Sequence, residues 1–294
     1  MTTTTAPVRL QDEPAPTATR SLKSLLSEPI VYVIALGVIG STIAPVIYSA
    51  LGGFRSTGQI AEKPVALPKP WIFDNYKNTL TSEVFWRQVY NSSVVALITT
   101  VLVVVLGLMA AFALSRYEFR GREFIYTIFT LGLLFPLTVG VLPLFLLIRQ
   151  MDLADNPMGV ALPQAAFALP MTIVILRPFL RALPKEIEEA AVIDGCSKIG
   201  FFWRIVIPLS GPGVVTTGVL AFVGSWNAYL LPLLLLTEPD SYTLPLGVAT
   251  YSTQYTQDTA AVLAFTSLAM LPALTFFLLA QRRIVGGLTG AVKG

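Results

Sequence analysis

The stretch QVYNSSVVALITTVLVVVLGLMAAFALS, Gln88–Ser115, runs for 28 residues without an aspartate, glutamate, lysine or arginine. A helix needs about 20 predominantly apolar residues to cross the hydrocarbon core of a bilayer. The stretch therefore predicts a membrane-spanning helix. The rest of the chain agrees, because 54% of its 294 residues are hydrophobic and only 13% are charged, against about 25% charged in an ordinary soluble domain.

Five further windows of this kind predict an all-α, polytopic membrane protein with six transmembrane helices. They are Pro29–Phe54, Phe124–Ile148, Asn156–Leu176, Ile205–Thr237 and Thr259–Gln281. The window that starts at Ile205 is longer than one crossing needs, and Pro208 and Pro212 place the start of its span near Gly213. Prolines inside the other windows, such as Pro136, are tolerated in membrane helices where neighbouring groups satisfy the freed carbonyls.

The distribution of lysine and arginine predicts the orientation of these spans. Fourteen of the 20 lie in the two tails and in the loops after the second and fourth spans, and six lie in the loops after the first and third. Positive residues accumulate on the cytoplasmic side, so both termini are expected to be cytoplasmic. Residues 1–28 are rich in Thr, Pro and Ala and predict a disordered cytoplasmic tail without a signal peptide.

Composition also excludes several kinds of chemistry. The sequence has no histidine and one cysteine, Cys196, which removes the commonest general base, the commonest zinc ligand and any disulfide within the chain. It lacks a G-x-x-x-x-G-K-[ST] phosphate-binding loop. No catalytic residue, metal site or bound cofactor is therefore expected. The net charge of +3 is too small to indicate nucleic acid as a partner.

A compact charged segment, PKEIEEAAVIDGCSKIG at Pro184–Gly200, interrupts the apolar chain. Pro184 suits the first position of a helix, the early glutamates complement its dipole, and Gly195 suits its end. Ser197 is a good N-cap for a second helix. One narrow stripe of the first helix comprises Ile187, Ala190, Ala191 and Asp194.

Two functions fit this segment equally well from the residues alone. A short helix with a narrow face of small residues can enter a groove on a soluble partner. Alternatively, the segment can lie on the lipid headgroups, anchored by the aromatic run Phe201–Trp203.

The spacing in this region resembles a known motif. Glu189-Ala190-Ala191, Gly195 and Ile205-x-Ile207-Pro208 match the EAA loop of binding-protein-dependent ABC importer permeases, with Ile207 in place of the usual leucine. The wider context RPFLRALPKEIEEAAVIDG resembles the carbohydrate-importing, maltose-type branch, as do WNAYLLPL, TLPLGVATY and the ending QRRIVGGLTGAVKG. The resemblance covers nearly everything from Pro29 to Gly294.

This resemblance implies a type I ABC importer permease fold. The transmembrane permease domain would cover residues 29–294, with a core over 85–282 and the EAA loop over 181–208. In the family this loop forms coupling helices that sit in a cleft of a cytoplasmic ATPase. The coupling residues that it implies here are Glu189, Ala190, Ala191, Asp194, Gly195, Ile205 and Pro208.

The implied function is that of one transmembrane subunit of an ATP-driven importer in the bacterial plasma membrane. It would move a carbohydrate, expected to be a di- or oligosaccharide, by alternating access. The expected partners are a second permease subunit, a cytoplasmic ABC ATPase dimer that uses the ATP, an extracytoplasmic sugar-binding protein and membrane lipid. The alternatives are a glycerol-phosphate or polyol importer of the same family, a membrane-embedded lipid-sugar transferase, and a facilitator without an ATPase. The absence of charge in the six windows favours a neutral sugar.

A possible substrate path lies in the fifth span. Asn227 places an amide in hydrocarbon, which is costly unless it faces the bundle interior or a water-filled path. One reading is a sugar contact, in which Asn227 bonds a hydroxyl and the aromatic face of Trp226 stacks on a sugar ring. The other is an interhelical hydrogen bond from Asn227, with Trp226 as an interfacial anchor. Ser225 and Tyr229 share this ambiguity. Secondary candidates in the fourth span are Gln164 and Thr172.

Overall fold

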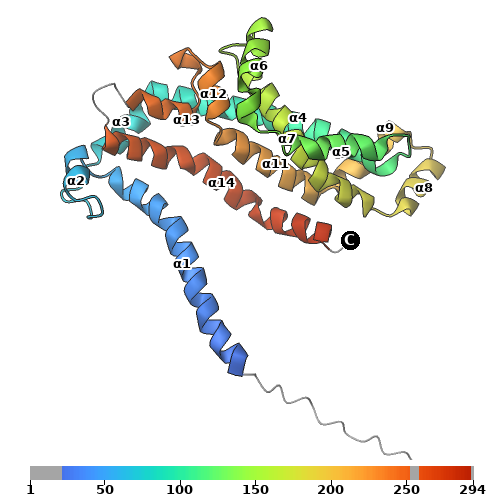
Figure 1. The fold of residues 1–294 in the computed structure, drawn as a ribbon, viewed down its shortest axis with the longest axis horizontal. Coiled ribbons are helices and arrows are strands. Elements are labelled where there is room, and N and C mark those ends of the chain that lie inside the picture. The colour runs from blue at the N-terminus through green and yellow to red at the C-terminus, as the bar shows by residue number, and fades with distance from the viewer. Residues whose placement is uncertain (1–21, 252–257, 293–294) are drawn as a thin grey trace, which may run out of the picture. The chain divides into compact units, whose positions relative to one another are not determined.

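The computed structural model describes residues 22–251 and 258–292, and every regular element in those ranges is helical (Figure 1). The expected all-α fold is therefore confirmed. The chain divides into two compact units, one ending at Tyr48 and one beginning at Ser49. Residues 1–21 of the predicted tail lie outside the described residues, and helix α1 begins at Leu22.

In the described part of the chain, four helices are long and apolar enough to cross a membrane unaided. They are α1 (Leu22–Gly52), α4 (Glu83–Arg116), α7 (Pro157–Arg181) and α14 (Thr259–Val292). Two bent helix pairs raise the number of candidate spans to as many as six. These six places correspond to the six windows expected from the sequence.

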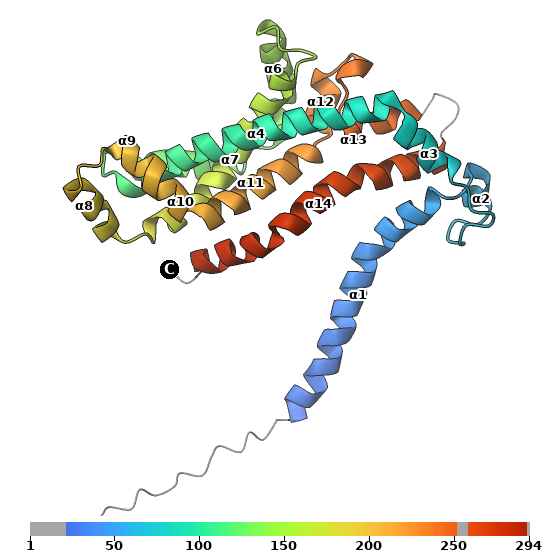
Figure 2. The same ribbon diagram turned by 180° about the vertical axis from the view of Figure 1, so that it is seen from behind.

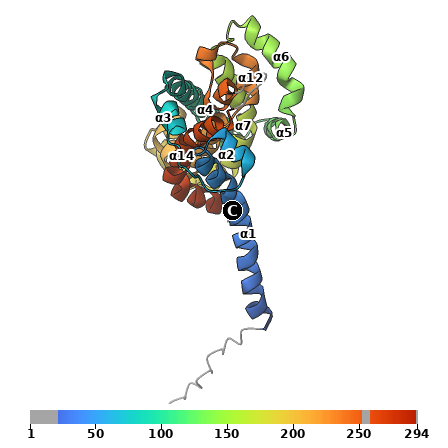
Figure 3. The ribbon, with the colours of Figure 1, turned by 90° about the vertical axis from the view of Figure 1, so that its left-hand side faces the viewer.

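The third window is not one continuous helix, so that part of the expectation is wrong. It forms α5 (Arg122–Gly132) and α6 (Leu137–Gln150), which are bent by 98° and visibly diverge in Figure 3. Pro136 is not tolerated inside a helix here. It sits in extended backbone as the N-cap of α6, because proline lacks an N–H and disfavours helical backbone before it.

The fifth window is also broken. The helical run Lys198–Leu209 and helix α11 (Gly211–Trp226) meet at an angle of 78°. Ser210 leaves helical geometry, and Pro212 occupies the first turn of α11. The start of α11 agrees with the sequence-based start of the span near Gly213.

The remaining described elements are short. They are α2 (Thr57–Glu62), α3 (Asp74–Thr81), α8 (Lys185–Ile193), α9 (Lys198–Phe201), the π-helical turn η1 (Phe202–Val206), α10 (Ile207–Leu209), α12 (Leu230–Leu235), α13 (Leu244–Gly247) and the 3₁₀ turns η2 (Pro239–Ser241) and η3 (Val248–Tyr251).

The second unit is a bundle in which α4 packs against α7 and α11, and α11 packs along α14 (Figure 2). Small residues allow the close approach of α4 and α7, because a Cβ on Gly107 would meet the side chain of Thr172. Such small residues are the usual means of close helix packing in membranes. Helices α8 and α9 lie at one end of this bundle, and α2 and α3 lie at the other.

Asp155, in the loop between α6 and α7, joins that loop to the segment that follows α12. Its carboxylate accepts hydrogen bonds from Thr237 N at 2.6 Å, Thr237 Oγ1 at 2.7 Å and Glu238 N at 2.8 Å. Burial alone would raise the pKa of Asp155, but these hydrogen bonds outweigh it and hold the pKa below its ordinary value. The charged form is therefore the one that the folded protein favours.

We expect Asp155→Asn to lower the melting temperature by a few degrees at pH 7. A carboxylate with a depressed folded pKa stabilises the fold above its unfolded pKa of about 3.9. That stabilisation is lost as the pH falls through the folded pKa. The difference between Asp155→Asn and the parent should therefore be constant from neutral pH down to about pH 5 and shrink below about pH 4.

The control for this measurement is Asp152→Asn. Asp152 has a φ of 54°, close to the 53° of Asp155, but its carboxylate makes no comparable bonds to the described residues. It should melt like the parent at every pH. A difference at Asp155 that persists unchanged in acid would contradict the role given to its charge.

Candidate functional site

The charged segment folds into two short helices joined by a tight turn. Pro184 is the N-cap of α8 rather than its first residue. Ser197 caps α9 as expected, because its Oγ accepts a hydrogen bond from Gly200 N at 3.1 Å. The two-helix arrangement predicted for this segment is therefore present.

Gly195 makes the turn between them. Its φ is 74°, which is the left-handed region that favours glycine. Gly195 N donates to Val192 O at 3.0 Å, and Cys196 N donates to Ala191 O at 2.8 Å. This pair of hydrogen bonds closes the C-terminus of α8. A Cβ at Gly195 would meet nothing within 4 Å, so glycine is required for its backbone and not for space.

Helix α8 has an inner face that packs on the bundle. Ala191 is buried there, and Ile187 packs beside it against a cluster that includes Phe112, Phe201 and Phe202. The ring centroids of Phe112 and Phe202 are 5.2 Å apart. Half of the stripe expected from the sequence therefore points into this chain, because α8 needs an apolar face to be held on the bundle.

The outer face of α8 makes no packing contact with the bundle, and Glu189, Val192 and Ile193 on this face line a groove beside the helix. Glu189, Ala190 and Asp194 are exposed. Beside them, Val192 is 66% exposed and Ile193 is 84% exposed. Sequence reasoning missed these two apolar residues, although their adjacency in a short charged helix was the available signal.

The last two predicted coupling residues lie on the chain that leads to α11. Ile205 is half-buried against the same aromatic cluster. Pro208 is exposed in α10, two residues before the bend at Ser210. Both therefore belong to the connection between α9 and the bundle, and not to the outer face of α8.

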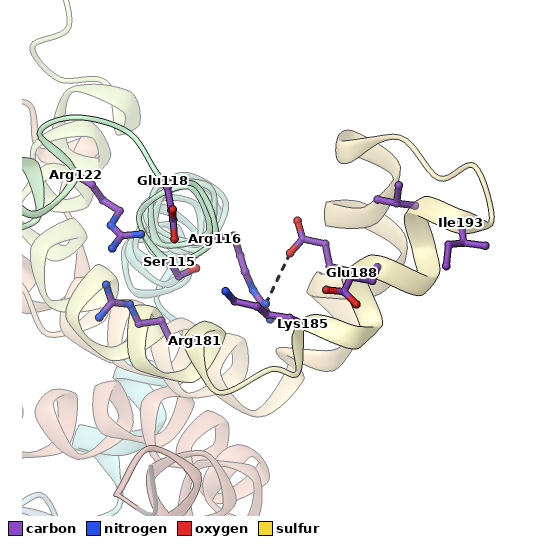
Figure 4. A pocket seen from close by; sticks show the side chains of 10 residues that line it. Ser115, Arg116, Glu118, Arg122, Arg181, Lys185, Glu188 and Ile193 are labelled. Atoms are coloured by element: carbon purple, nitrogen blue, oxygen red, sulfur yellow. Dashed lines mark ion pairs between the residues drawn. The ribbon is translucent and has the colours of Figure 1, made fainter.

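A groove of about 840 Å³ separates α8 from the ends of α4, α5 and α7 (Figure 4). Arg116 crosses it, because its Nη1 lies 3.8 Å from Glu188 Oε2 and its Nη2 donates to Leu183 O at 2.7 Å. The Arg116 side chain is only 6% exposed. A buried arginine at the end of α4 thus ties down both α8 and the loop that precedes it.

A second arginine secures the neighbouring helices. Arg177 on α7 donates its Nε to Leu114 O at 3.2 Å and its Nη2 to Glu123 on α5. Its guanidinium lies 3.8 Å from the centre of the Tyr126 ring. The ends of α4, α5 and α7 are therefore held together as the base on which α8 sits.

The predicted substrate-path residues do not lie together. Trp226 is buried, its ring stacks on Phe222 with centroids 5.7 Å apart, and its Nε1 donates to Ala269 O at 3.2 Å. Asn227 is exposed as the C-cap of α11. Thr172 bonds within its own helix, to Ala168 O at 3.0 Å.

Ser225 and Tyr229 do meet, at a cavity of about 350 Å³ between α4, α7, α11 and α12. Gln164 and Thr99 line the same cavity. Thr99 Oγ1 donates to Gln164 Oε1 at 3.2 Å, and Ser225 Oγ donates to the same oxygen. The described residues contain no group of three His, Cys, Asp or Glu that could hold a metal ion.

Known proteins resemble this chain in both sequence and fold. Residues 103–289 match the family described as "binding-protein-dependent transport system inner membrane component". The chain is 36% identical over 249 residues to the diacetylchitobiose uptake system permease protein NgcG of Streptomyces coelicolor, covering 84% of this chain and 82% of that protein. It is 36% identical over 260 residues to the trehalose transport system permease protein SugB of Mycobacterium tuberculosis, covering 87% and 94%.

The fold has a solved counterpart. A chain in the crystal structure of a bacterial ABC transporter involved in the import of the acidic polysaccharide alginate superposes with a TM-score of 0.75. That comparison covers 92% of this chain and 99% of the other at 21% identity. The match over residues 103–289 and the identity to these relatives show the family. The chain belongs to the inner membrane components of binding-protein-dependent transport systems.

Proposed function

We propose that this chain is one transmembrane subunit of an ATP-driven importer for a neutral di- or oligosaccharide in the bacterial plasma membrane. The observation that carries the proposal is the match over residues 103–289 to a binding-protein-dependent transport family. The functions of the relatives support a sugar: one serves diacetylchitobiose uptake and another trehalose transport. The absence of charge in the six apolar windows favours a neutral sugar over a glycerol phosphate.

The outer face of α8 is the proposed docking surface for a cytoplasmic ABC ATPase. It presents Val192 and Ile193 beside Glu189, Ala190 and Asp194. The competing use, anchoring on lipid headgroups, loses two of its three aromatic residues, because Phe201 and Phe202 are buried in the protein. The lysine and arginine bias supports a cytoplasmic position for α8 and for both termini.

In the proposed cycle, ATP binding closes an ATPase dimer and moves α8. Packing of Ile187 and Ala191 on the bundle, together with the Arg116–Glu188 ion pair, passes that movement to α4 and its neighbours. The spans of this chain and of a second permease then rock to open the path outward. An extracytoplasmic binding protein delivers sugar, and hydrolysis resets the pair. This chain binds no cofactor and performs no chemistry.

Reconstitution tests this function. The chain would be placed in proteoliposomes with a partner permease, an ABC ATPase and a sugar-binding protein, and given labelled diacetylchitobiose or trehalose. We expect accumulation that requires both ATP and the binding protein, and that sn-glycerol 3-phosphate does not inhibit. Accumulation without the ATPase would identify a facilitator instead, and transfer of sugar to lipid would identify a transferase.

A further inference from the structure

We propose that this chain itself holds the transported sugar, through the amide N–H groups of Gln164 in the cavity beside α11. The inference rests on the proposed function and adds to it the subunit, the cavity and the donor group. It also moves the sugar contact away from Trp226, whose ring is buried elsewhere.

The Gln164 amide lies beside two hydroxyl groups. Two hydroxyls, those of Thr99 and Ser225, donate to its Oε1. The Nε2 atom therefore carries its two N–H groups on the opposite side of the amide. Gln164, Thr99 and Ser225 come from α7, α4 and α11, so these hydrogen bonds join three helices.

The Nε2 atom has no partner within the described part of the chain, although Gln164 is only 8% exposed. A buried donor without a partner destabilises the fold. Nε2 itself is covered in this conformation, but Gln164 lines the cavity, so a rotation of its side chain would present the unpartnered N–H groups to an acceptor there. The two candidates are water, which often satisfies such groups, and the transported ligand.

The lining of the cavity favours a neutral sugar unit. Its volume of about 350 Å³ falls at the lower end of the range of about 300–1,000 Å³ for ligand sites. The lining is mostly apolar, includes the rings of Phe167 and Tyr229, and has no charged side chain among the described residues. Sugar hydroxyl oxygens accept N–H bonds and sugar C–H faces pack on rings, whereas an ionised ligand would be desolvated without a counter-charge.

Two glycines of α11 provide matched reporters for the cavity. A Cβ on Gly224 or on Gly211 would meet nothing within 4 Å, and only Gly224 is among the cavity-lining residues. Gly224→Cys and Gly211→Cys would each be assembled in the full transporter and exposed to a methanethiosulfonate reagent during turnover, with and without transported sugar. Peptide mass spectrometry measures the labelling of each cysteine separately, so the native Cys196 does not have to be replaced.

We expect sugar to slow labelling of Gly224→Cys several-fold and to leave Gly211→Cys unchanged. Adding Gln164→Leu should abolish this protection and reduce uptake at least about tenfold, the equivalent of one lost hydrogen bond of about 1.4 kcal/mol. ATP hydrolysis stimulated by the sugar-loaded binding protein should persist. Thr172→Val is the matched control, because it removes a buried hydroxyl from the same helix away from the cavity.

Three other outcomes would overturn the inference. If the parent transporter imports sugar but Gly224→Cys is unprotected or does not react, the cavity holds water or is closed to the sugar. If Gln164→Leu leaves protection and uptake intact, another group holds the sugar. If Thr172→Val loses as much uptake as Gln164→Leu, the Gln164 effect is structural. Failure of the parent to import any sugar would instead reject the proposed function.

Discussion

Replacing Ile193 by aspartate is expected to abolish ATP-driven uptake while the protein still folds and inserts. Ile193 is 84% exposed at the end of α8, so its side chain contributes little to the fold of this chain. In the proposed ATPase cleft, the substitution loses about 1.5–3 kcal/mol of apolar burial and adds the cost of burying a charge. A loss of about 100-fold or more in ATPase association follows.

Co-purification of the ATPase with the tagged chain, and uptake in proteoliposomes, both measure this effect. Ile193→Met is the control, since it keeps an apolar side chain of similar volume. Gly195→Asp and a bulky residue at Ala190 alter the same surface and should give the same loss. Normal uptake and co-purification of the Ile193→Asp protein would show that α8 is not the coupling surface.

Gly159→Ala is expected to be the most damaging single change to the fold itself. A Cβ at this position would overlap the carbonyl oxygen of Leu153 and lie 3.2 Å from Ile148 Cγ2. The loop cannot easily retreat, because Leu153 N donates to Ile148 O at 3.1 Å and Asp155 N donates to Leu235 O at 3.0 Å. Overpacking of this kind costs about 1–3 kcal/mol, and more where backbone must move.

The melting temperature and the monodispersity of the purified protein in detergent check this prediction. Gly40→Ala is the matched control, because a Cβ there, also within a helix, would meet nothing within 4 Å. It should melt at or slightly above the parent temperature, since alanine favours helix more than glycine does. A Gly159→Ala protein that melts with the parent would show that the loop can adapt.

The sequence predicted best where the determining pattern is local. The length of the uncharged run at Gln88–Ser115 requires a spanning helix, and α4 covers it. The stop at Gly195 and the cap at Ser197 depend on backbone preferences within a few residues, and both are present. The effect of Pro136 was harder to predict, because a proline either bends or ends a membrane helix according to what packs around it.

The same difference between local pattern and tertiary packing applies to the candidate sites. The sequence marked α8 as unusual, but its residues alone did not say which side faces the bundle. That depends on Phe112 of α4, which packs against Phe201 and Phe202 and leaves room for Ala191. Likewise, Trp226 looked available for a sugar until the packing on Phe222 and α14 buried it.

By itself, the sequence determined that this protein is helical, apolar over six windows and a member of a transport family, because length, composition and motif spacing suffice for these. Only the tertiary structure decided that Ile193 is free while Ala191 is buried. It alone brought Gln164 to Ser225, 61 positions away in the chain, and to Thr99, 65 positions away. The physical reason is that buried polar groups find partners through helix packing, which no local pattern encodes.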